Sequence, residues 1–171
     1  MNTFALEIFD NEGSICSFYT VRWEDSDISE ADRFFDNYNN AKHNRAYQEL
    51  AVFIFKKIAD ETGALEDYFR FENSAQALPP SGKYDIGELT INYANFPLRL
   101  YCLRISDQLV VLFNGGEKTA GTAQGGKTSM AFIEANGFAK RILEAWAQND
   151  IYVAPSGREF RYYNNNTEIL L

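Results

Sequence analysis

The periodicity of the apolar residues changes at one loop, and this change limits the fold more than any other feature of the sequence. Between Tyr47 and Ala59, apolar residues recur at steps of three and four, which is the period of a helix. After the loop Leu78–Gly82 they recur at steps of two, which is the period of a strand. The loop contains two prolines, which lack an amide donor and disfavour helix in the preceding residue. The chain is therefore predicted to be α+β, with an antiparallel sheet.

Turn and cap residues set the predicted boundaries of the elements. Ser29 is expected to cap a short helix that reaches about Asn39, and Gly63 to end the helix over Tyr47–Ala59. A third helix is predicted from about Ser129 to Ala147. The predicted strands are an N-terminal hairpin of Phe4–Phe9 and Ile15–Trp23, three runs at Tyr84–Tyr93, Leu98–Ile105 and Leu109–Phe113, and a C-terminal hairpin of Ile151–Ala154 and Glu159–Tyr163. Because the three middle runs are joined by short connections, they are expected to pair sequentially as a central antiparallel sheet flanked by helices.

Composition limits what the chain can bind. Its 171 residues fit one domain, expected to span residues 1–171, at a prior of about 150 residues per domain. The charge balance of 16 Lys+Arg against 24 Asp+Glu gives −8, so nucleic acid could be attracted only by a local basic patch. One His and two distant cysteines cannot supply four zinc ligands, so no metal is predicted, and Cys16 and Cys102 are expected to be buried free thiols. No signal peptide or membrane-spanning run is recognisable, which predicts a cytoplasmic protein that does not enter a membrane.

One segment matches a nucleotide-binding motif literally. Gly121–Thr128 satisfies the P-loop pattern G-x-x-x-x-G-K-[ST], in which Lys127 would reach a terminal phosphate. The preceding strand ends near Phe113, too far from Gly121, and too few residues follow for the parallel sheet that usually accompanies this loop. A flexible glycine-rich loop is therefore the favoured interpretation, and no cofactor is predicted. In a weaker form of the hypothesis, Lys127 and the amides at a helix N-terminus hold a phosphate.

Three other groups of residues have a functional and a structural interpretation. His43 is the only imidazole and is expected in an exposed polar turn. The clusters Asp25–Asp32 and Asp60–Asp67 lack the spacing of a calcium loop and are expected to be solvated acidic faces. Arg70 alternates with Tyr68, Phe69 and Phe71, a mixture that can stack RNA bases, although aromatic packing at the core is favoured.

The strand Leu98–Ile105 carries the strongest candidate site. Alternation places Arg99 and Tyr101 on one face and Arg104 on the other. A neighbouring arginine and tyrosine can contact a phosphate and a base. The alternative is a charge at the margin of the sheet with a tyrosine packed beside it.

The order of several short segments resembles one known superfamily. The segments are Leu78–Gly82, Glu88-Leu89-Thr90, Arg99-Leu100-Tyr101, Leu109–Phe113, Glu117-Lys118-Thr119 and Ala139-Lys140-Arg141. In this order, from about Gln76 to Trp146, the chain resembles the RelE/HigB superfamily of toxins from toxin–antitoxin pairs, particularly its phage-derived HigB-like branch. The resemblance implies a RelE/HigB-like fold.

The same resemblance implies an activity and partners. Members cleave messenger RNA, usually on the ribosome, without a metal, by using the 2′-hydroxyl of the RNA as nucleophile. Carried over, Arg99 would hold the scissile phosphate, Tyr101 would stack or assist proton transfer, and Lys118 would offset developing charge. The expected protein partner is an antitoxin from a neighbouring gene. Thr90 and Glu117 stand where the family commonly has basic residues, so the alternative is a non-catalytic protein-binding domain of the same fold.

Overall fold

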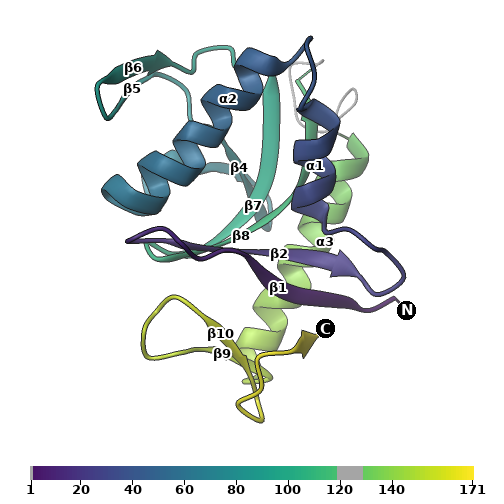
Figure 1. The fold of residues 1–171 in the computed structure, drawn as a ribbon. Coiled ribbons are helices and arrows are strands. Elements are labelled where there is room, and N and C mark those ends of the chain that lie inside the picture. The colour runs from purple at the N-terminus through teal and green to yellow at the C-terminus, as the bar shows by residue number, and fades with distance from the viewer. Residues whose placement is uncertain (1, 119–128) are drawn as a thin grey trace.

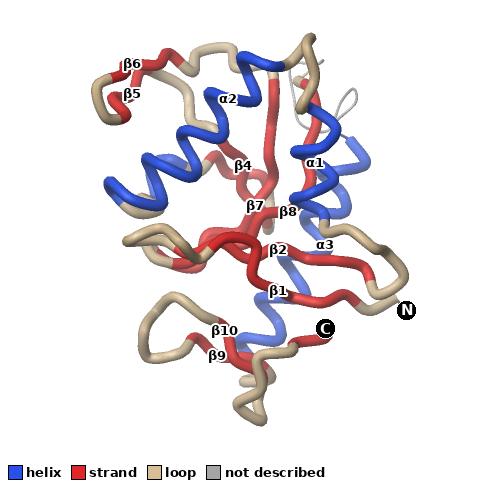
Figure 2. The backbone as a smooth tube through the Cα atoms, in the orientation of Figure 1, coloured by secondary structure: helices blue, strands red, loops and turns tan. Residues whose placement is uncertain are grey.

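The computed structural model describes residues 2–118 and 129–171, and its fold is shown in Figures 1 and 2. Its helices are α1 (Glu30–Tyr38), α2 (Asn44–Val52) continued by the π-helical η1 (Phe53–Thr62), the short 3-10 helix η2 (Glu66–Tyr68), and α3 (Ser129–Ala147). Its strands are β1 (Phe4–Asp10), β2 (Ser17–Trp23), β3 (Arg70–Glu72), β4 (Ala75–Leu78), β5 (Lys83–Ile86), β6 (Leu89–Asn92), β7 (Leu98–Ser106), β8 (Leu109–Glu117), β9 (Ile151–Val153), β10 (Phe160–Tyr162) and β11 (Ile169–Leu170).

The predicted α+β class is confirmed, with a large central sheet. In the described part of the chain, seven strands form this sheet in the order β11-β1-β2-β8-β7-β4-β3. The β7–β8 and β1–β2 hairpins pair as predicted, and β9–β10 forms the C-terminal hairpin. However, β2 pairs with β8 in parallel, so the sheet is mixed rather than antiparallel.

The predicted strand over residues 84–93 is wrong. Gly87 has φ +59° and turns the chain, so β5 and β6 pair with each other in a small separate sheet. The neighbour of β7 is instead β4, where Leu78 lies opposite Leu100. β4 carries two alanines, which have little intrinsic preference for strands, and for this reason the pattern did not indicate it.

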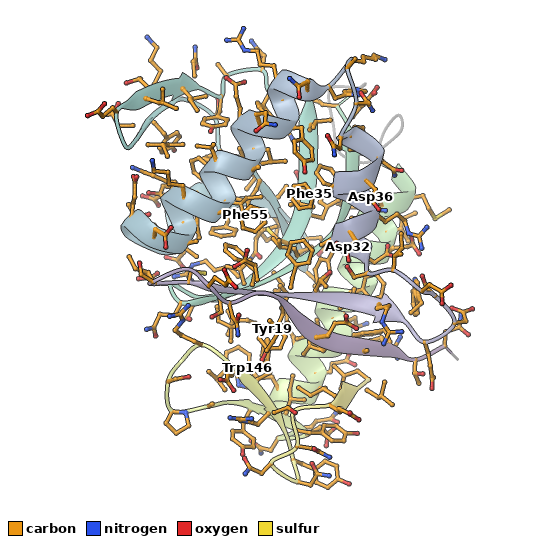
Figure 3. All side chains as sticks on the ribbon, in the orientation of Figure 1. Tyr19, Asp32, Phe35, Asp36, Phe55 and Trp146 are labelled. Atoms are coloured by element: carbon orange, nitrogen blue, oxygen red, sulfur yellow. The ribbon has the colours of Figure 1, made fainter. Side chains whose placement is uncertain are left out.

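Helices cover both faces of the sheet. α1, α2 and η1 pack on one face through residues such as Phe34, Leu50 and Ile54, and α3 packs on the other through Phe138 and Ile142. Figure 1 shows α3 behind the sheet and α1 and α2 in front of it. In Figure 3 the rings of Phe35 and Phe55 meet between α1 and η1, with centroids 5.9 Å apart. The chain therefore builds two apolar cores, one on each side of the sheet.

The predicted helix boundaries are largely confirmed. Ser29 caps α1 by accepting a hydrogen bond from the backbone N–H of Asp32 at 3.1 Å. Gly63, with φ +80°, follows η1 and ends it.

Both Cys16 and Cys102 are buried and unpaired, and burial raises the pKa of Cys16 to about 12. No helix among the described residues is both long and apolar enough to cross a membrane.

The sheet splits where β2 and β8 separate, and α1 begins at this point. The two strands stay in register from Ser17 opposite Leu109 as far as Thr20 opposite Leu112. There the Thr20 hydroxyl donates to the carbonyl of Leu112 at 2.8 Å and accepts from the N–H of Ala31 at 3.2 Å. One buried hydroxyl thus joins β2, β8 and the first turn of α1.

Candidate functional site

Arg99 and Tyr101 lie at the start of β7 and share one face, as the alternation predicts. This is the face that α3 covers, because the ring of Tyr101 meets the ring of Phe132 at 5.9 Å between centroids. Tyr101 is fully buried and Arg99 is only 7% exposed. Arg104 points to the opposite face, where its Nε donates to the carbonyl of Ala64. The structure therefore places the two candidate residues on one face of the sheet, where α3 covers Tyr101 and Arg99 is almost inaccessible to solvent.

Gly115 makes the close approach of β7 and β8 beside Arg99 sterically feasible. A Cβ at Gly115 would lie 1.8 Å from the carbonyl oxygen of Arg99, which is far inside van der Waals contact. The register of the two strands shifts just beyond this point, between Leu100 and Cys102. The bulge and the glycine together fix the backbone that carries Arg99.

The guanidinium of Arg99 is desolvated and makes only a long hydrogen bond to the described residues. Its hydrogen bond runs from Nη1 to the carbonyl of Leu98 at 3.4 Å. Among the described residues no carboxylate oxygen lies within 4.0 Å of it. Burial lowers the pKa of Arg99, the nearby Arg70 lowers it further, and Glu72 opposes both effects. A second positive charge therefore acts on the buried guanidinium.

Arg70 and Glu72 reach this face from β3. They pair with Ala77 and Ala75 of β4, two buried alanines that separate β3 from β7 on the same face. The Nε of Arg70 donates to the carbonyl of Pro79 at 2.7 Å. Burial raises the pKa of Glu72, while Arg99 and Arg70 lower it. Two guanidinium groups against one carboxylate leave a net positive cluster, which we call the Arg70–Arg99 cluster.

Two further residues predicted from the sequence are Lys118 and Lys127. Lys118 is exposed and follows β8, where its N–H donates to the carbonyl of Pro97 at 2.7 Å. It therefore lies at the end of the sheet where β7 begins and Arg99 is placed. Lys127 and the P-loop pattern at 121–128 lie outside the described residues. The predictions made for that segment remain predictions.

A histidine–glutamate pair, which no sequence pattern indicates, lies at the same end of the sheet. The Nε2 of His43 is 2.6 Å from Oε1 of Glu117, and its Nδ1 is 3.0 Å from Oδ1 of Asn40. The expectation of an exposed turn for His43 is therefore wrong, because its side chain is largely buried against Tyr38. Burial and Glu117 raise the pKa of Tyr38. The partners are 74 residues apart, and no local pattern connects them.

Glu117 points away from Arg99. It pairs with Leu98, whose side chain belongs to the core under α1 and α2, whereas Arg99 faces α3. The carboxylate of Glu117 is thus bound to His43 on the other face. It does not neutralise the Arg70–Arg99 cluster directly.

The expectation of a solvated face is also wrong for Glu30. This residue is only 3% exposed, at the first position of α1 beside the split in the sheet. Burial raises the pKa of its carboxyl, Glu134 of α3 raises it further, and Arg33 and Asn114 oppose the shift.

In the described ranges, no three His, Cys, Asp or Glu side chains form a group that could hold a metal ion.

No family model, no curated protein and no solved structure is significantly similar to this chain.

Proposed function

We propose that the chain binds RNA through its phosphates at the Arg70–Arg99 cluster, as a protein of the RelE/HigB toxin type. The observation that carries the proposal is the buried guanidinium of Arg99, which shares its face of the sheet with Arg70, two strands away, and has no carboxylate within 4.0 Å among the described residues. A buried cation without a close counter-ion is costly, and a phosphate would supply the missing charge. Guanidinium groups also match phosphate oxygens in geometry.

Each residue has a distinct role in this proposal. Arg99 contacts the scissile phosphate, Arg70 contacts a neighbouring one, and the exposed Lys118 attracts the RNA from solvent. The 2′-hydroxyl of the RNA is the nucleophile, so the protein positions the chain and stabilises charge in the transition state. Tyr101 is a packing residue that supports the strand under α3, because its ring is enclosed against Phe132.

Induced expression in a bacterial host tests this proposal. We expect the wild-type chain to arrest growth and bulk translation, and Arg99→Gln to relieve the arrest, because removing a charge that stabilises a transition state costs about 10²–10³ in rate. Arg45→Gln is the matched control, since it removes the same charge from a side chain that is 91% exposed on α2. Equal arrest by wild type and Arg99→Gln at matched levels would contradict the site.

Binding of a labelled single-stranded RNA to the purified protein tests the phosphate contacts directly. We expect the affinity to fall with salt, and Lys118→Ala to reduce the slope of log K against log salt by about 0.7, the value for one phosphate contact on a single strand. Arg45→Gln should leave the slope unchanged. An affinity that does not depend on salt would exclude phosphate recognition.

A non-catalytic protein-binding domain of the same fold is the second candidate. It is favoured by the complete burial of Tyr101 and the near-complete burial of Arg99. It is also favoured by the formal charge of −8, which repels RNA away from the cluster. This candidate predicts a harmless wild-type chain and no binding of RNA at low salt.

A further inference from the structure

β3 forms one outer edge of the central sheet, and this edge is not covered by any described strand. β4 pairs with one side of β3, and within residues 2–118 and 129–171 no strand pairs with its other side. Natural proteins usually protect such edges by keeping the strand short, by placing charged side chains or proline on it, or by a bulge. β3 is short and carries two charges, Arg70 and Glu72, but it has no proline and its register with β4 is regular, so its outer edge stays open to a strand with the complementary charges.

Phe71 is unusual for a residue at a sheet edge. It is 83% exposed, the highest value among the large apolar side chains that the structure places at the surface. Its neighbours Arg70 and Glu72 point to the opposite face, as alternation requires. The edge therefore offers a bare aromatic ring on one face and a pair of opposite charges on the other.

The three residues are complementary to themselves. When two such strands run antiparallel about a two-fold axis at Phe71, Arg70 of each lies opposite Glu72 of the other, and the two phenylalanines face each other. Opposite charges and aromatic pairs directly across two antiparallel strands are favourable, and like charges are unfavourable. A two-fold axis repeats each contact, which is the usual symmetry of a dimer.

We propose that the β3 edge pairs with the β3 edge of a second copy of this chain, so that the two central sheets become one continuous sheet. We assign the partner as a second copy of this chain because two antiparallel β3 strands place Arg70 of one opposite Glu72 of the other. The strand is short, so the interface is small and the association is weak. The proposal does not depend on RNA binding, although Arg70 and Glu72 also belong to the Arg70–Arg99 cluster.

Charge reversal with complementation tests this interface by sedimentation equilibrium over a concentration series. Arg70→Glu alone and Glu72→Arg alone each place like charges opposite each other at both symmetric positions, so each should weaken self-association about tenfold or more. An equal mixture of the two variants restores one acidic and one basic side chain in every facing pair. The mixture should therefore associate within about threefold of the wild-type affinity.

Phe71→Ser provides an independent variant, because its side chain is exposed and its loss leaves the core intact. We expect it to weaken association, with an unchanged circular dichroism spectrum. A wild-type chain that remains monomeric at millimolar concentration would overturn the proposal. A mixture that does not re-associate, while the wild type dimerises, would also overturn it, because another surface would then form the dimer.

Discussion

At the scale of single residues, Gly115 gives the sharpest prediction of stability. A Cβ there would overlap the backbone of Arg99 and Leu100, at 1.8 and 3.0 Å from their O and Cα atoms, so β7 and β8 would have to separate. We expect Gly115→Ala to lower the free energy of unfolding by about 3 kcal/mol, measured by urea denaturation. Gly137→Ala is the control, because nothing lies within 4 Å of that position in α3. It should stabilise the protein by about 0.5–1 kcal/mol.

Glu30 makes the stability depend on pH in a direction unusual for a carboxylate. Burial, and then Glu134, raise its pKa above the ordinary value of 4.5. The folded state therefore keeps the proton to a higher pH than the unfolded state. As pH rises from the ordinary to the raised pKa, the free energy of unfolding falls, and it stays lower at neutral pH.

Glu30→Gln should remove this loss, because the amide resembles the protonated carboxyl. We expect the variant to be more stable than wild type at neutral pH and nearly equal to it in acid, below pH 4.5. Urea midpoints measured across this range check the prediction. Glu12→Gln, at an exposed turn, serves as the control for removing one negative charge. A gain for Glu30→Gln that is equal at every pH would contradict the assignment to this titration.

At the scale of elements, the hydroxyl of Thr20 joins three of them. Thr20→Val keeps the shape of the side chain but removes the bonds to the carbonyl of Leu112 and the N–H of Ala31. Because buried polar groups lose a partner, we expect a loss of about 1–3 kcal/mol in the free energy of unfolding. Thr20→Ser keeps the hydroxyl and should lose much less. Equal losses for the two variants would mean that packing, rather than the hydrogen bonds, matters here.

The elements that the sequence predicts well are those with a local signal. Ser29 marks the start of α1 and Gly63 the end of η1, because capping depends on neighbouring residues. β4 has no such signal, since its alanines become strand residues only through pairing with β3 and β7. The parallel pairing of β2 with β8 is likewise invisible locally, because the partners are 92 residues apart at Thr20 and Leu112.

The candidate site likewise has some features that local sequence predicts and others that depend on tertiary contacts. The alternation along β7 correctly predicts that Arg99 and Tyr101 share a face and that Arg104 does not. It cannot predict that α3 covers this face, because burial depends on how a distant helix packs. The pairing of His43 with Glu117 depends on tertiary contact too, and the sequence offers only the two residue types.

At the scale of the whole molecule, hydrogen bonds from Arg158 connect the C-terminal hairpin to the N-terminal hairpin. Its guanidinium donates to Ser17 Oγ at 3.1 Å and to the carbonyls of Asn11, Gly13 and Ser14. Arg158→Met should lower the free energy of unfolding by about 1–3 kcal/mol and speed hydrogen exchange in β9 and β10. Arg161→Met is the matched control from the same hairpin, since its ion pair with Glu159 is partly exposed.

The parallel pairing of β2 with β8 also has a consequence during protein synthesis. A ribosome completes β2 early but makes Leu112, which receives the hydrogen bond of Thr20, 92 residues later. At about 5–20 residues per second, the nascent chain waits on the order of ten seconds before this partner is made. During that time the β1–β2 hairpin shows an apolar, unpaired edge beside the ribosome. The early hairpin is therefore exposed to aggregation for longer than the modest length of the chain suggests, and chaperones should improve the yield of folded protein.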